Sequence, residues 1–167
     1  MASVDRGEDP AAAAAGVTAA GAEPLYLLAQ GTMRSAQLTG WAATLAVKDA
    51  CLAMMARAAE LDERVDGAGP HRALGAWRAA LPIAAGGGAT AARAHFDRVR
   101  ALQPTDLLAR VAEAETLAVL LQDGARFDAL LAEVEAFDVA QDPARAAENR
   151  VAKRLAGELA KRRSRLF

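Results

Sequence analysis

The sequence predicts an all-α protein, and three observations indicate this fold class. Alanine, the strongest helix former, supplies 46 of the 167 residues, whereas aromatic residues make up only 4%. Apolar residues recur at helical spacing, and no segment alternates between apolar and polar residues with the period of a β-strand. Short breakers rich in Gly, Pro and Asp separate the helical segments, so we expect helices joined by short turns.

The composition changes near Pro24, which suggests two regions. Residues 1–23 contain a run of Ala and Gly without bulky side chains to bury, so we expect a flexible or loosely helical arm. Residues 24–167 carry the periodic apolar pattern and form the expected α-helical domain. The pattern predicts seven helices, over residues 24–38, 42–61, 71–84, 90–102, 105–121 and 125–137, and a last one that follows Asp142-Pro143.

The helix over residues 125–137 has the clearest periodicity. Phe127, Leu130, Leu131, Val134 and Phe137 recur at intervals of three and four residues, which places them on one face. Of these, Phe127, Leu130 and Leu131 are predicted to lie in the core, together with Phe96. In the last helix, Asp142 is expected to cap the N-terminus, with Pro143 at the first helical position. Apolar faces are expected on three other helices. They consist of Leu45, Leu52, Met55, Ala56 and Ala59 in the helix over residues 42–61, of Ala92, Phe96 and Val99 in the helix over residues 90–102, and of Ala147, Val151, Leu155 and Leu159 in the last helix.

Composition and motif searches argue against several functional classes. A net charge of −1 gives no general reason to bind nucleic acid, and one cysteine, Cys51, excludes a disulfide framework or a zinc cluster. His71 and His95 lack the spacing of metal ligands. Gly86-Gly87-Gly88 is followed by no Gly-Lys-Ser/Thr, so it predicts a turn and not a phosphate loop. We therefore expect no catalytic residue, no metal and no cofactor.

The sequence contains no segment that resembles a membrane span. The longest uncharged stretches cover about 14 residues (79–92) and 13 residues (35–47), which is shorter than the roughly 18–20 apolar residues that a spanning helix needs. Residues 1–23 lack a basic start and a leucine-rich core, so no signal peptide or lipoprotein motif is expected in this chain. Taken literally, this pattern predicts a cytoplasmic protein.

Some spacings are typical of helical-hairpin repeats of the tetratricopeptide (TPR) type. Leu74-Gly75 would lie in the first helix of a hairpin, and Ala92-x3-Phe96 followed by Pro104 would lie in the second. The interval between these motifs is longer than in a standard repeat, with the excess over residues 81–87. The pattern predicts three hairpins and a C-terminal capping helix, although any helical bundle could place Ala, Leu and Phe at such spacings.

Several of these motifs, taken together, resemble the TRAP-transporter T-component family. They are His71-x2-Leu74-Gly75, Leu81-Pro82, Gly86-Gly87 and Ala92-x2-His95-Phe96, and they are followed by Gln122-Asp123 and Phe127-x2-Leu130-Leu131. The resemblance covers about residues 24–167 and corresponds to the C-terminal part of the family. Gly88-Ala89 stands where the family usually has Asp-Pro, and the family's lipoprotein signal and additional repeats are absent from this chain.

The resemblance implies a TPR-like, non-enzymatic component of a periplasmic solute-uptake system. Its partner would be the solute-binding P component of the transporter, and it could form a homotrimer. The alternative is a cytoplasmic TPR-type adaptor or scaffold subunit of another complex. The genomic neighbourhood, or a signal sequence upstream of Met1, would distinguish the two.

The candidate site residues are those that depart from a plain TPR. We expect Trp77, Leu81, Gln122 and Asp123 to contact a ligand or partner, because a repeat that only stacks would not need them. A second set is expected to be structural: Leu74, Gly75, Pro82, Gly86, Gly87, Ala92, Phe96 and Phe127.

Overall fold

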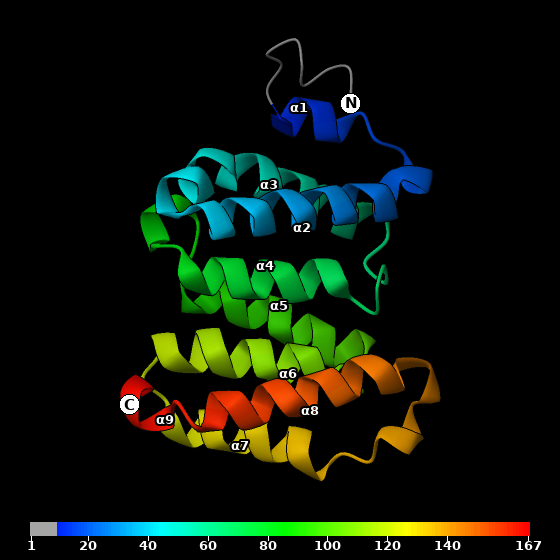
Figure 1. Ribbon diagram of the computed structural model, residues 1–167. Coiled ribbons are helices and arrows are strands. Elements are labelled where there is room, and N and C mark those ends of the chain that lie inside the picture. The colour runs from blue at the N-terminus through cyan, green and yellow to red at the C-terminus, as the bar shows by residue number, and fades with distance from the viewer. Residues whose placement is uncertain (1–9) are drawn as a thin grey trace. The chain divides into compact units, whose positions relative to one another are not determined.

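The computed structural model describes residues 10–167, in which every regular element is helical. This confirms the all-α prediction for the described part of the chain. The chain divides into two compact units, residues 1–74 (unit 1) and 75–167 (unit 2), and each is described by itself (Figure 1). No helix within residues 10–167 is both long enough and apolar enough to cross a membrane.

Unit 1 is built around an antiparallel pair of long helices, α2 (Ala22–Thr39) and α3 (Trp41–Leu61). The chain reverses between them at Gly40, whose φ of +137° favours glycine. The short helix α1 (Pro10–Ala15) packs against α3, and a 3-10 turn (Ala19–Gly21) leads into α2. The N-terminal arm expected from the sequence covers residues 1–23, and residues 1–9 of it lie outside the described residues. In the described part of the arm, Ala14 of α1 is buried.

The buried face of α3 differs from the expected one. Leu52 and Met55 are buried as the pattern predicts, but Leu45 is 42% exposed. Ala56 and Ala59 are only partly buried, and the fully buried neighbours of Met55 are Cys51 and Ala58. Alanine occurs on every side of α3, so its apolar pattern does not mark one face clearly.

A strained loop joins α3 to α4 (Gly69–Ala80), the helix in which unit 1 ends. Asp66, Gly67 and Ala68 all have positive φ angles, which is uncommon outside glycine. The Asp66 carboxylate accepts hydrogen bonds from the Tyr26 hydroxyl (2.7 Å) and from Nη2 of Arg72 (2.6 Å). These bonds connect the loop to α2 and to the start of α4, and together they hold the strained backbone in place.

Unit 2 contains the end of α4 and the helices α5 (Ala89–Leu102), α6 (Leu107–Glu113), α7 (Gly124–Ala136), α8 (Ala146–Ala160) and α9 (Arg163–Leu166). The expected third helix ends earlier than predicted, at Ala80, and a separate 3-10 turn covers Ile83–Ala85. Pro82 explains this, because proline lacks an N–H and disfavours helical geometry at the preceding Leu81. α6 continues through a π-helical turn, Ala114–Ala118.

Two apolar clusters form the core of unit 2. The larger one joins α6, α7 and α8, and Phe127, Leu130, Leu131 and Val134 of α7 are all buried in it, on the face that the period predicts. Its other members are Leu107, Val111, Ala114, Ala118, Ala152, Ala156 and Leu159. The smaller cluster consists of Ala79 in α4, Ala92 and Phe96 in α5, and Leu117 in the π-helical turn.

The prediction for the face of the last helix was wrong. Val151 and Leu155 are exposed on α8, and so is Ala147; of the predicted stripe only Leu159 is buried. The buried side chains are Asn149, Ala152, Ala156 and Leu159. Small residues on this face let α8 approach α6 closely, and the side-chain oxygen of Asn149 accepts a hydrogen bond from the Leu107 amide (3.3 Å).

The expected cap of the last helix was also partly wrong. Pro143 does begin a helical segment, the 3-10 turn Pro143–Arg145 that precedes α8, but the Asp142 side chain does not cap it. Instead, the Asp142 carboxylate accepts hydrogen bonds from the hydroxyl of Thr105 (2.5 Å) and from Nε2 of Gln103 (3.3 Å). Asp142 therefore connects the start of the last helical segment to the α5–α6 loop.

Candidate functional site

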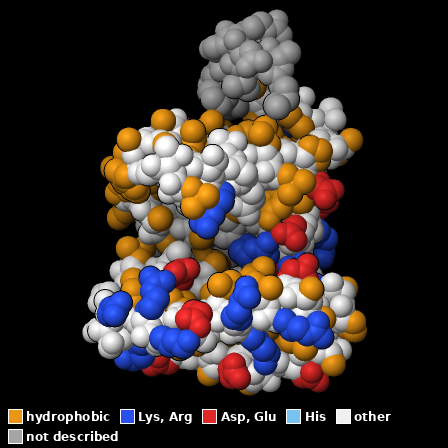
Figure 2. Space-filling view, in the orientation of Figure 1, with side chains coloured by type: hydrophobic (Ala, Val, Ile, Leu, Met, Phe, Trp, Pro, Cys, Tyr) orange, Lys and Arg blue, Asp and Glu red, His pale blue; other side chains and the backbone are white. Residues whose placement is uncertain are grey.

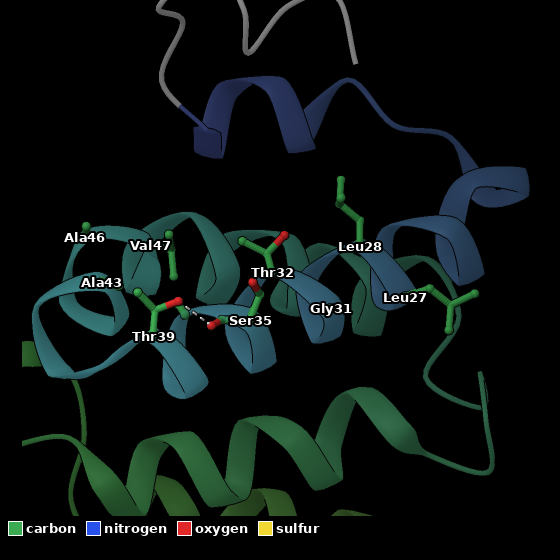
Figure 3. Close-up of a pocket in the computed structure, with 10 residues that line it drawn as sticks. Leu27, Leu28, Gly31, Thr32, Ser35, Thr39, Ala43, Ala46 and Val47 are labelled. Carbon is green, nitrogen blue, oxygen red and sulfur yellow. Dashed lines mark hydrogen bonds between the residues drawn. The ribbon is translucent and has the colours of Figure 1, made fainter.

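An open apolar groove lies along the α2–α3 hairpin in unit 1 (Figure 3). Its volume is about 670 Å³. Leu27, Leu28, Gly31, Thr32, Ser35, Ala36 and Thr39 line it from α2, and Ala43, Ala46 and Val47 line it from α3. The groove exists because small residues recur on the side of α2 that faces solvent, where larger side chains would fill the space.

The chemistry of the groove is that of a weak apolar binding surface. Its ten lining residues include no charged side chain, and the polar groups are the hydroxyls of Thr32, Ser35 and Thr39. The Thr39 hydroxyl donates to the Ser35 carbonyl (2.9 Å), so it already has a partner within α2. Such a groove can hold an apolar chain or an apolar helix face, but it offers nothing to neutralise an anion.

Sequence reasoning missed this groove, because the candidate residues were chosen for departing from a TPR pattern and all four follow residue 75. One signal was available: Gly31, Ser35 and Thr39 recur every four residues on α2. Residues at that spacing share a helix face, and small ones leave a depression there.

Trp77 lies in the last turn of α4, Leu81 is the first residue after that helix, and both are partly buried. The turn that follows them is tightly packed. A Cβ atom at Gly87 would lie 2.1 Å from the Leu81 carbonyl oxygen, so only glycine fits there. Nη1 of Arg78 donates to the Gly86 carbonyl (2.6 Å), and Gly86 has a φ of +75°. The glycines of this turn therefore serve backbone geometry.

A second close approach lies further back, within α4 itself. A Cβ atom at Gly75 would lie 3.0–3.1 Å from the ring of Phe96, so α4 and α5 meet where glycine leaves room for the aromatic ring. Leu74 and Ala92 are each buried, whereas Pro82 is exposed.

Gln122 and Asp123 form the turn between α6 and α7, and both are exposed. The Asp123 carboxylate accepts a hydrogen bond from the Arg126 amide (2.8 Å) and caps α7. Gln122 has a φ of +54°, and its side-chain amide donates to the carbonyls of Val119 (3.0 Å) and Leu166 (3.3 Å). This turn and the α4–α5 turn lie at the same edge of unit 2 (Figure 1). Leu81, Gln122 and Asp123 lie in these two turns, and Trp77 lies in the last turn of α4.

Charged side chains from three helices form a network in unit 2. Arg100 Nη1 donates to Glu133 Oε2 at 3.0 Å, and Arg110 Nε donates to the same oxygen at 3.2 Å. Arg126 makes two hydrogen bonds to Glu113 Oε1, at 2.8 and 3.1 Å. Arg110 and Glu113 are buried, whereas Arg100, Arg126 and Glu133 are partly exposed, so the network connects α5, α6 and α7 from the protein interior to its surface.

The electrostatics of this network fit a structural role. Burial lowers the pKa of Arg110, and the neighbouring Arg100 lowers it further. Burial raises the pKa of Glu133, but the hydrogen bond and charge of Arg100, with the charge of Arg110, outweigh it and leave this pKa below its usual value. Glu133 thus stays ionised and bound by guanidinium groups, which leaves it unsuited to act as a general base.

Cys51 and His71 are two further side chains that could take part in chemistry, and they lie in separate parts of the chain. Cys51 is buried in α3, and burial raises the pKa of its thiol to about 11, so the thiol is neutral at physiological pH. Nε2 of His71 lies 3.5 Å from the carboxylate of Glu63. Over the part of the chain that the structure describes, no group of three or more His, Cys, Asp or Glu residues could hold a metal ion.

The model of the TRAP transporter T-component family matches residues 3–167, which is nearly the whole chain. The match therefore extends beyond the resemblance described above, since it includes most of residues 1–23. No curated protein matches the chain.

Proposed function

The chain belongs to the TRAP transporter T-component family, and on that premise we propose that it acts by binding the solute-binding P component of its transporter. Members of this family are accessory components of tripartite ATP-independent periplasmic transporters and are not known as enzymes, so the chain is a TRAP transporter accessory component. The contact with the P component is the proposal, and the family match over residues 3–167 is the observation that carries it.

The uncharged groove of unit 1 argues against a role for this chain in carrying an organic anion. None of its lining residues is charged, so an anionic solute would lose its hydration there without gaining a charged partner. The cargo implied by the family resemblance is an organic anion or a hydrophobic solute. We assign an anionic cargo to the P component and a contact role to this chain.

The contact surface that we propose is the edge of unit 2 formed by the α4–α5 and α6–α7 turns, which includes Trp77, Leu81, Gln122 and Asp123. The structure adds exposed apolar side chains to these candidates: Ile83 is 83% exposed, and Leu120 and Leu121 directly precede Gln122. Apolar side chains beside polar ones are typical of the centre and rim of a protein interface. The sequence analysis did not select Ile83, Leu120 or Leu121.

The proposal also includes the finer properties that family resemblance implies, namely a TPR-like stack of hairpins, a periplasmic location and a homotrimer. The helix pairs α2–α3 and α6–α7, each joined by a short turn, support the stack. The close fit of Gly75 against Phe96 supports a third pair, α4–α5. Sedimentation equilibrium would test the trimer directly.

Titration calorimetry against the cognate P component tests the contact. We expect a dissociation constant in the micromolar range for a transient partner, and no binding at about 100 μM would contradict the proposal and favour the adaptor alternative. Ile83→Glu and Leu121→Glu should each weaken binding at least about tenfold. Leu155→Glu is the matched control for Leu121→Glu, because Leu155 is as apolar and as exposed as Leu121 (42% each) but lies on α8. Equal losses in all three variants would contradict the proposed edge.

A further inference from the structure

The turn between α2 and α3 carries large apolar side chains that face solvent. Leu38 and Trp41 flank Gly40 and are 73% and 66% exposed, and Leu45 follows one helical turn later on α3. We call these three residues the hairpin tip. Figure 2 shows hydrophobic side chains gathered at this end of unit 1. Exposed aromatic and leucine side chains next to each other are unusual in the absence of a partner.

The hairpin tip is uncharged, and a cation bounds the uncharged stretch on each of its two helices. Residues 35–47 contain no charged side chain, and Arg34 on α2 and Lys48 on α3 bound this stretch. Arg34 lies six residues before Gly40 and Lys48 eight residues after it. At the rise of an α-helix, these cations lie about 9 and 12 Å from the turn. Lys48 is paired with Asp49 at 2.5 Å, so two cations and one anion leave one net positive charge at this level.

We infer that the hairpin tip inserts into the interface of a lipid bilayer that contains anionic lipids. Tryptophan prefers the membrane–water interface, because its ring is apolar and its N–H can still find a polar partner there. Amphipathic elements at this interface bury their apolar side chains about 5–10 Å deep. Insertion of the uncharged tip to that depth would bring Arg34 and Lys48 to the level of the lipid headgroups, where cations are attracted to anionic lipids.

A bilayer fits this surface better than a protein partner does. A specific protein interface buries about 800 Å² on each side and needs a surface of matching shape with a polar rim. The hairpin tip offers three large side chains at the end of two helices, which is too narrow for such an interface. A bilayer adapts to the end of a helical hairpin and requires only apolar side chains followed by cations. The contact would be weak and reversible, as single membrane signals are.

Vesicle flotation of the full chain tests this inference. The probe is a vesicle of phosphatidylcholine with about one third phosphatidylglycerol. We expect the chain to float with these vesicles and brominated lipids to quench tryptophan fluorescence, with the quenching lost in Trp41→Phe. Leu38→Glu should weaken binding about tenfold or more. Leu27→Glu should change it less than about twofold, because Leu27 is exposed on the same helix but lies about 19 Å from the turn.

The charges are tested with Arg34→Gln, which should weaken binding to the anionic vesicles several-fold and leave binding to pure phosphatidylcholine unchanged. Three results would overturn the inference: no flotation of the chain, equal losses in Leu38→Glu and Leu27→Glu, or no effect of Arg34→Gln. Self-association that Leu38→Glu abolishes, measured by sedimentation without vesicle binding, would show that a second copy covers the tip and would also overturn it.

Discussion

Phe127→Ala should destabilise unit 2 by about 3–5 kcal/mol. Phe127 is fully buried in the cluster that joins α6, α7 and α8, and its ring packs edge-on against Phe167 with a centroid distance of 5.1 Å. Its removal would forfeit the transfer free energy of the ring and leave a cavity that rigid helices cannot fill. Unit 2 has about 90 residues, so each kcal/mol shifts the melting temperature by about 4–8 °C. The expected drop is therefore at least about 12 °C.

Urea unfolding followed by circular dichroism would measure this free energy, and hydrogen exchange would locate it. Exchange should accelerate in α6, α7 and α8, with little change in α2 and α3. Leu155→Ala provides the control, because Leu155 is exposed on α8 and should change stability by no more than about 0.5 kcal/mol. The reasoning is refuted if Phe127→Ala melts as the unmodified chain does, or if both variants lose the same stability.

Three further predictions follow from contacts described above. Gly87→Ala should cost at least about 1 kcal/mol of unfolding free energy in urea, because the new methyl group would overlap the Leu81 carbonyl; an unchanged midpoint would show that the turn can relax. The pKa of Glu133 is lowered in the folded chain, so its contribution to stability is present above the unfolded pKa of about 4.5 and is lost as the pH falls through the folded value. Glu133→Gln should therefore flatten the pH dependence of the melting temperature below pH 4.5. A curve parallel to that of the unmodified chain would contradict this. Cys51, buried with a thiol pKa of about 11, should react with a thiol reagent at pH 8 only as fast as unit 1 opens, so rapid labelling of the folded chain would be inconsistent with its burial.

The sequence predicted the helices best where large side chains mark one face. In α7, Phe127, Leu130, Leu131 and Val134 recur at helical spacing and are all buried, because no other face of that helix is apolar enough to compete. The prediction failed for α8, where the buried face consists of alanines and Asn149. A pattern search favours Val151 and Leu155 for their size, whereas close helix packing selects small residues.

The candidate site was less accessible to sequence reasoning. The groove of unit 1 is lined largely by small, uncharged residues, and its existence depends on how far apart α2 and α3 pack. The network of Arg100, Arg110 and Glu133 joins residues up to 33 positions apart, and no local spacing indicates such a contact. Asp123 was more predictable, because capping depends only on the residues that immediately follow it.

The π-helical turn of α6 has a consequence for how unit 2 unfolds. Leu117 in this turn belongs to the cluster with α4 and α5, while its neighbours Ala114 and Ala118 belong to the cluster with α7 and α8. The π-helical turn thus supplies side chains to both clusters. If this turn unfolds, the side chains of both clusters become exposed to water together. In helical repeat proteins, stability is often close to a sum over neighbouring units, and the ends can fray separately. Here the shared segment should make α5, α6 and α7 exchange their amide hydrogens at a common, slow rate, as a single cooperative block.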